Sequence, residues 1–83
     1  MANAGVLLLY GTVGCTLCEQ AREMAEVEVA RAAFIIEDVD IADDDAMLER
    51  YATRIPVVRR ADRSVELDWP FDHHGLRMLL QDD

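Results

Sequence analysis

The pattern of apolar and polar positions predicts that strands and helices alternate along the first half of the chain. Residues 6–10 form an uninterrupted apolar run, which is typical of a central strand covered on both faces. Apolar residues then recur at the spacing of one helix face, and these are Leu17, Ala21, Met24 and Ala25. This helix has no clear end, because residues 26–29 alternate as a strand does. A second strand is predicted over residues 34–39.

The second half of the chain predicts two more helices and two more strands. Asp43-Asp44-Asp45 and Asp72 precede apolar helical patterns, and an aspartate at a helix start can accept backbone N–H groups. A third strand begins at residues 55–58, the polar residues 59–63 form a turn, and residues 64–69 form a fourth strand. The predicted order is therefore β-α-β-α-β-β-α, an α/β fold with a four-stranded mixed sheet.

This topology places several candidate site residues at one edge of the sheet. The first two strands should be parallel, because a helix fits between them, and the last two should form a hairpin. Ligands bind at the carboxyl ends of parallel strands in such sheets. We therefore expect Cys15, Cys18, Pro56 and Trp69 to lie together at this edge. The start of the last helix, with Asp72 and His73, is expected there too.

Size and charge exclude several classes of function. The 83 residues allow one domain, residues 1–83,. A net charge of −9 argues against binding to nucleic acid and to anionic membranes. No apolar segment approaches the ~20 residues of a membrane span, and the first residues do not resemble a secretory signal. Together with one close cysteine pair, these features lead us to expect a monomer in the reducing cytoplasm.

The most informative motif is Cys15-Thr16-Leu17-Cys18, at the predicted start of the first helix. The first turn of a helix brings residues i and i+3 close enough for a disulfide. The positive end of the helix dipole also favours a thiolate over a thiol. The spacing therefore permits a reversible disulfide, and the position makes one sulfur nucleophilic.

The cysteine pair has three other interpretations. A disulfide across three residues closes almost no loop and stabilises little, so a purely structural bond is disfavoured. A zinc site usually needs four ligands, and the two histidines, His73 and His74, lie far along the chain, so we expect no metal. Two inert buried cysteines remain an open alternative, because free cysteine packs well in cores.

The chain resembles the glutaredoxins of the thioredoxin superfamily. Tyr10, Gly14-Cys15-Thr16-Leu17-Cys18 and Ile55-Pro56-Val57 carry this resemblance, in this order. It is more similar still to small bacterial glutaredoxin-like proteins, which share Val39-Asp40-Ile41 and the segment from Tyr51 to Val57. The resemblance covers almost the whole chain and implies a thioredoxin/glutaredoxin-like fold.

The resemblance implies a thiol–disulfide oxidoreductase acting on a protein or small-molecule disulfide. Cys15 matches the nucleophilic cysteine and Cys18 the resolving one. Pro56 matches the family's cis-proline, and the backbone of Ile55 would pair with the substrate. By their expected position, Trp69, Asp72 and His73 are further candidates for substrate contact. The alternative is a non-catalytic binding module that keeps the fold with redox-silent cysteines.

The chain departs from glutaredoxins at the positions that hold glutathione. Thr16-Leu17 replaces the usual Pro-Tyr, and no basic residue precedes the motif. Trp69-Pro70-Phe71-Asp72 replaces a Gly-Gly-x-Asp loop. We therefore expect poor activity with glutathione and no requirement for a cofactor.

Overall fold

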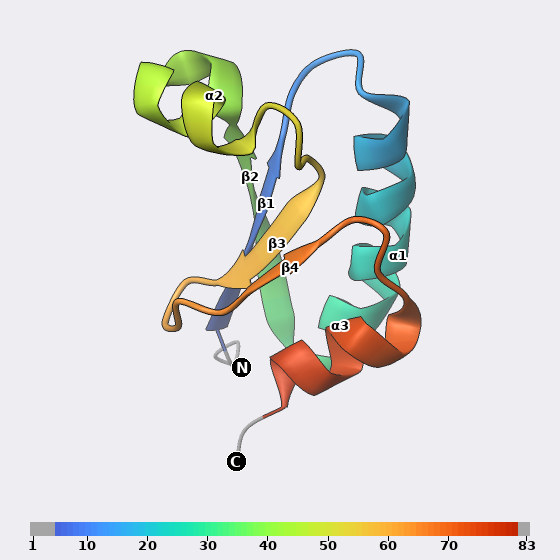
Figure 1. The fold of residues 1–83 in the computed structure, drawn as a ribbon. Coiled ribbons are helices and arrows are strands. Elements are labelled where there is room, and N and C mark those ends of the chain that lie inside the picture. The colour runs from blue at the N-terminus through green and yellow to red at the C-terminus, as the bar shows by residue number, and fades with distance from the viewer. Residues whose placement is uncertain (1–4, 82–83) are drawn as a thin grey trace.

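The computed structural model describes residues 5–81 and has the predicted order of elements (Figure 1). The strands are β1 (Gly5–Gly11), β2 (Phe34–Asp40), β3 (Val57–Arg60) and β4 (Glu66–Asp68). The helices are α1 (Thr16–Ala32), α2 (Asp45–Tyr51) and α3 (His73–Leu80), with a short 3-10 helix, η1 (Ile41–Asp43), before α2. The α/β fold with a four-stranded mixed sheet is thereby confirmed.

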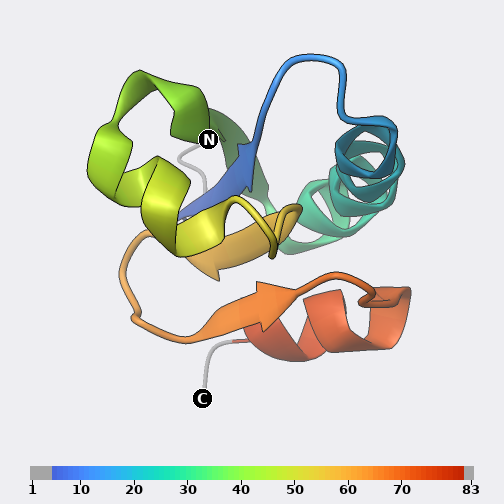
Figure 2. The ribbon, with the colours of Figure 1, turned by 45° about the horizontal axis from the view of Figure 1, so that its top comes forward.

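The sheet has the strand order β2-β1-β3-β4. β1 runs parallel to β2 and antiparallel to β3, and β4 pairs antiparallel with β3. As predicted, the apolar first strand is central. Helices α1 and α3 cover one face of the sheet and α2 covers the other (Figures 1 and 2).

Each face of the sheet carries its own apolar cluster, because alternate side chains of a strand point to opposite faces. Leu7 and Leu9 of β1 join the larger cluster, and Leu7 is 0% exposed. Tyr10 joins the smaller cluster beneath α2. The larger cluster is completed by Ala21, Ala25, Val29, Phe34, Val58, Phe71, Leu76 and Leu80. The smaller is completed by Ile41, Tyr51 and Val57.

Helix α1 differs from the prediction in its buried face and its length. Leu17 is 44% exposed and Cys18 is buried in its place. The strand-like segment 26–29 is helical, and within it Glu28 is only 1% exposed while Val27 faces solvent. The helix ends where Ala33 adopts a left-handed conformation with φ 61°, a common helix stop.

The predicted polar turn after the third strand is wrong at its first two residues. Arg59 and Arg60 belong to β3, and Arg60 is only 2% exposed. Burial is tolerated because its guanidinium bonds to the Asp62 carboxylate at 3.0 Å and to the Gln81 carbonyl at 2.9 Å. The guanidinium also lies 4.8 Å over the ring of Phe34. Arg60 thus ties β3 to the end of α3.

Candidate active site

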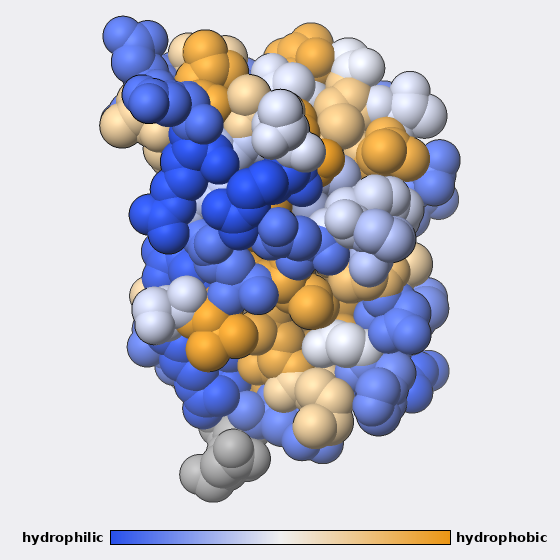
Figure 3. All heavy atoms as spheres, in the orientation of Figure 1, coloured by the Kyte–Doolittle hydropathy of each residue, from blue (hydrophilic) through white to orange (hydrophobic). Residues whose placement is uncertain are grey.

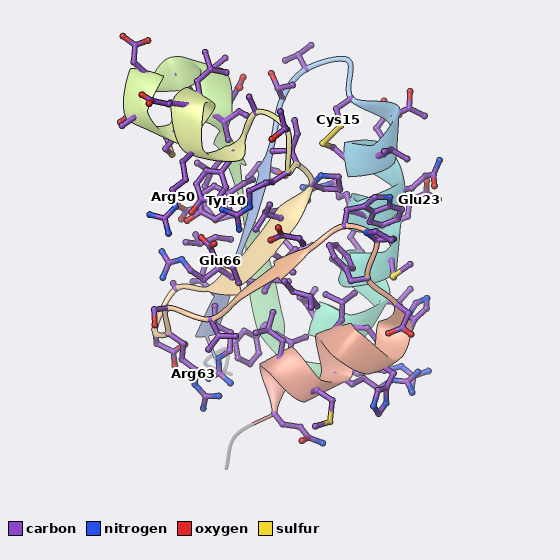
Figure 4. All side chains as sticks on the ribbon, viewed as in Figure 1. Tyr10, Cys15, Glu23, Arg50, Arg63 and Glu66 are labelled. Carbon is purple, nitrogen blue, oxygen red and sulfur yellow. A yellow bond between two sulfur atoms is a disulfide. The ribbon has the colours of Figure 1, made fainter. Side chains whose placement is uncertain are left out.

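Cys15 and Cys18 form a disulfide at the start of α1, with their Cα atoms 5.2 Å apart (Figure 4). Cys15 is the N-cap residue of the helix, and its sulfur accepts the backbone N–H of Cys18 at 3.1 Å. The free N–H groups of a first helical turn carry partial positive charge. After reduction, the same position would stabilise a Cys15 thiolate.

The two sulfurs differ in exposure. Cys18 is 9% exposed and faces the end of β1, whereas Cys15 is less buried. A Cβ atom built on Gly11 would lie 3.0 Å from the Cys18 sulfur. The glycine therefore allows α1 to start close to the end of β1. Cys15 is the accessible sulfur of the pair.

Few cations support a thiolate at this site. Arg22 is the single arginine of the described residues that lines the cavity beside both cysteines. Its guanidinium is already paired with Asp38 and, at 3.4 Å, with Glu26. Stabilisation of a Cys15 thiolate would therefore come mainly from the helix terminus and the Cys18 N–H.

The Ile55–Pro56 segment lies at the same edge of the sheet as the disulfide. Its peptide bond is cis, and Val57, the next residue, pairs with Tyr10 near the end of β1. The carbonyl of Pro56 accepts the Trp69 N–H at 3.0 Å. The topology thus brings Pro56 and Trp69 to the end of the sheet where α1 begins.

A charged network behind this segment was not anticipated from the sequence. The Arg54 guanidinium donates to Asp68 at 2.8 and 2.9 Å and to Glu66 at 2.7 Å. It also lies 5.0 Å over the ring of Tyr51, whose hydroxyl donates to Glu66. Arg54, the residue before Ile55, is therefore attached to β4. Figure 4 labels Glu66, Arg50 and Tyr10 around this network.

The network shifts the titration of its members. The hydrogen bonds from Arg54 lower the pKa of Asp68. Burial alone would raise the pKa of Glu66, but the hydrogen bonds from Tyr51 and Arg54 outweigh it and lower that pKa. Burial, together with the hydrogen bond to Glu66, raises the pKa of Tyr51 to about 12. The carboxylates therefore stay ionised and the phenol stays neutral at neutral pH.

The start of α3 does not lie where the sequence predicts. Asp72 caps the helix, as expected, by accepting the Gly75 N–H at 2.8 Å. His73, however, bonds through Nδ1 to Glu28 at 2.6 Å. Glu28 follows Cys18 by ten residues in α1, which corresponds to about 15 Å along the helix axis. The structure therefore brings neither His73 nor the first turn of α3 to the disulfide.

The buried carboxylate of Glu28 holds α3 against α1 at this position. Arg77 donates to it at 3.0 Å and His73 contacts its other oxygen. Burial alone would raise the pKa of Glu28, but the hydrogen bonds from Arg77 and His73 prevail and lower it. The first residue of α3 and Arg77 therefore supply both partners of this buried charge,.

Trp69 contributes to the core more than to an open groove. Its ring packs edge-on against Phe71 at a centroid distance of 5.1 Å. Phe71 is buried in the larger apolar cluster and Trp69 packs against that cluster. The contact of Trp69 with Pro56 is the hydrogen bond from its backbone N–H.

Residues 5–81 contain neither a cluster of potential metal ligands nor a membrane-spanning helix. No three histidine, cysteine or acidic side chains of this part of the chain come together as a potential metal site. None of its helices is long and apolar enough to cross a membrane.

Comparison with known proteins identifies the family. The family model of the Glutaredoxin-like domain (DUF836) matches residues 6–81. The chain belongs to this Glutaredoxin-like domain family. The resemblance indicated by the cysteine motif and by Ile55-Pro56-Val57 is thereby confirmed. No curated protein matches the chain.

Solved structures of two bacterial proteins resemble this Glutaredoxin-like domain. The crystal structure of XcR50 from X. campestris is 43% identical, with a TM-score of 0.69, over 89% of this chain and 93% of that one. The solution structure of XcR50 has a TM-score of 0.70 over 89% and 90% of the two chains, also at 43% identity. Ne2328 from Nitrosomonas europaea is 28% identical, with a TM-score of 0.72, over 82% and 81%.

Proposed function

We propose that this protein is a thiol–disulfide oxidoreductase that uses Cys15 and Cys18 as a reversible dithiol. The observation that carries the proposal is the Cys15–Cys18 disulfide at the N-cap of α1, with the Cys18 N–H donating to the Cys15 sulfur. A disulfide of this kind closes almost no loop, so stability does not account for it. Membership in the Glutaredoxin-like domain family supports the same chemistry.

The proposed reaction starts from the reduced protein. The Cys15 thiolate attacks one sulfur of a substrate disulfide, the substrate S–S bond breaks, and the leaving thiolate takes up a proton. Cys18 then loses its proton and attacks the Cys15 sulfur, which releases the second substrate thiol. Two electrons and two protons pass from the protein dithiol to the substrate, and the Cys15–Cys18 bond forms.

We place substrate contact at Ile55 and Pro56. These residues enter β3 at the edge where α1 begins, so a substrate held by the Ile55 backbone would lie near the Cys15 sulfur. Arg54, the residue before Ile55, is attached to β4 by its hydrogen bonds to Asp68 and Glu66. Arg54 therefore acts, in this proposal, as a positioning residue and not as a catalytic one.

Protein or peptide disulfides are proposed as substrates in preference to glutathione disulfide. The chain carries a net charge of −9, and like charges slow the encounter with an anionic substrate. Asp72 and the backbone of Gly75 are bonded to each other, so they offer no ready clamp for a carboxylate. Glutathione therefore remains a poor substrate in this proposal, and no cofactor is required.

The proposal is tested with the reduced protein and its Cys15→Ser and Cys18→Ser variants. Each is mixed with a neutral peptide disulfide and with glutathione disulfide, and thiol release and protein mass are followed. We expect the unaltered protein to reduce the peptide faster, and Cys18→Ser to accumulate a mixed disulfide on Cys15. Cys15→Ser serves as the matched control and should form no adduct at a comparable rate.

Two outcomes contradict the proposal. Failure of the unaltered protein to reduce either disulfide would indicate a binding module with redox-silent cysteines. Equally fast adduct formation by both serine variants would show that Cys15 is not the dedicated nucleophile.

A further inference from the structure

A cavity of about 380 Å³ opens beside the disulfide, on the side away from Pro56. Cys15 and Cys18 both line it, together with residues 11–14 and the end of β2. Pro56, by contrast, leads into β3, and β1 separates β2 from β3 in the sheet. The disulfide therefore has the Ile55–Pro56 segment on one side and this cavity on the other.

Part of the cavity wall is apolar. Leu9 comes from β1 and belongs to the larger apolar cluster, and Val13 stands at the rim with 90% of its surface exposed. Apolar side chains also face outward near the top of the molecule in the space-filling view (Figure 3). An aliphatic chain that entered the cavity would bury apolar surface against these walls.

The charged groups of the cavity are mostly carboxylates. Glu19, Asp38 and Asp40 line it together with one cation, Arg22. Arg22 is held by Asp38 and by Glu26 outside the cavity. Glu19 makes no ion pair with any residue in the described part of the chain. The lining therefore holds three carboxylates and one guanidinium, which is already paired.

We propose that this cavity binds a lysine or arginine side chain next to the disulfide cysteine of a protein substrate. The inference rests on the proposed oxidoreductase function and specifies its substrate class. The aliphatic stem would lie against Leu9 and Val13, and the charged head would reach the carboxylates of Glu19 and Asp38. Long basic side chains combine a buried stem with an exposed charge in this way. An acidic side chain would meet these carboxylates with like charge.

The test uses symmetric disulfide dimers of short peptides with one cysteine. The residue next to the cysteine is lysine, norleucine or glutamate, so that lysine and norleucine share the aliphatic stem and differ in charge. A neighbouring lysine also lowers the pKa of the leaving thiol and speeds exchange with any thiol. Each rate is therefore divided by the rate with dithiothreitol before peptides are compared.

Three variants separate a local effect from an effect of net charge. Glu19→Gln and Asp38→Asn each remove one carboxylate from the cavity. Glu49→Gln removes the same charge from an exposed position on α2 that does not line the cavity. The measured quantity is the ratio of kcat/KM for the lysine peptide to that for the norleucine peptide.

We expect the unaltered protein to favour the lysine peptide by about tenfold at low salt, as for two weakly screened ion pairs. The ratio should fall to about threefold in Glu19→Gln and in Asp38→Asn, and stay near tenfold in Glu49→Gln. A ratio near one in the unaltered protein, or an equal fall in all three variants, overturns the inference and leaves the oxidoreductase function standing. If no peptide is reduced, the proposed function fails, and the inference fails with it.

Discussion

Replacement of Gly11 by alanine should make the disulfide easier to reduce. The new Cβ would lie 3.0 Å from the Cys18 sulfur and 3.3 Å from the Cys18 Cβ. In the oxidised protein that sulfur is fixed by its bond to Cys15 and cannot turn away. In the reduced protein the thiol can rotate, so part of the crowding is relieved.

The size of the effect follows from this difference between the two redox states. Overpacking a buried contact costs about 1–3 kcal/mol. If reduction relieves roughly 1 kcal/mol of that cost, the potential of this two-electron couple rises by roughly 20 mV. The entropic effect of Gly→Ala on the unfolded chain is common to both redox states and cancels.

The assay is equilibration of Gly11→Ala with graded ratios of reduced and oxidised dithiothreitol, read by thiol alkylation and mass. Gly14→Ala is the matched control, because Gly14 precedes Cys15 but its added Cβ would meet nothing within 4 Å. Its φ of +81° strains alanine in both redox states alike,. A potential for Gly11→Ala that is unchanged or more negative than that of the unaltered protein would refute the reasoning.

Three further predictions follow from the same structure. Reduced Cys15 should react with iodoacetamide faster than Cys18, which is 9% exposed. Peptide mass mapping over a time course measures the two alkylation rates, and equal rates would contradict the prediction. Leu76→Ala, at a fully buried position, should lower the free energy of unfolding by about 2–5 kcal/mol in urea titration while the redox potential stays unchanged, whereas a loss below about 1 kcal/mol would show a loosely packed core. The pKa of Glu28 is lowered in the fold, so its stabilising effect is present above the ordinary carboxyl pKa and is lost as the pH falls. Between about pH 5 and pH 3, below the usual histidine range, the unaltered protein should therefore lose more stability than Glu28→Gln. Parallel losses in the two proteins would refute the assigned partners His73 and Arg77.

The fold could be predicted because local sequence patterns indicate its strands and helices. The apolar run of β1, a cap within Asp43-Asp44-Asp45, the cap at Asp72 and the crossover spacing each depend on a few neighbouring residues, and the structure contains all of them. The disulfide could also be predicted from the cysteine motif, since residues i and i+3 at a helix start are close enough to form one.

The parts that could not be predicted depend on contacts between distant residues. The burial of Glu28 and Arg60 does not follow from the sequence, because charged residues are rarely buried unless they are paired,. Their partners lie up to 49 residues away in the chain. One signal was available for Glu28, which falls seven residues after Ala21 and so continues the buried face of α1,. The displacement of α3 from the disulfide follows from the same buried pairing.

The Arg54 network escaped prediction for a similar reason. Arg54 reaches Glu66 and Asp68 only because the hairpin of β3 and β4 folds back beside it. The sequence shows a tyrosine and an arginine just before Ile55-Pro56, which marks the segment but does not identify its partners.

The central claim is that Cys15 and Cys18 form a reversible redox couple, and a redox titration of the unaltered protein tests it most directly. Helix α1 and the Cys18 N–H support a Cys15 thiolate, but Arg22 is paired and Glu19 adds negative charge nearby. A modestly stabilised thiolate gives a less oxidising couple, so we expect one two-electron transition nearer roughly −270 mV than roughly −120 mV. Cysteines that show no reversible transition, or a midpoint above about −180 mV, would contradict the account.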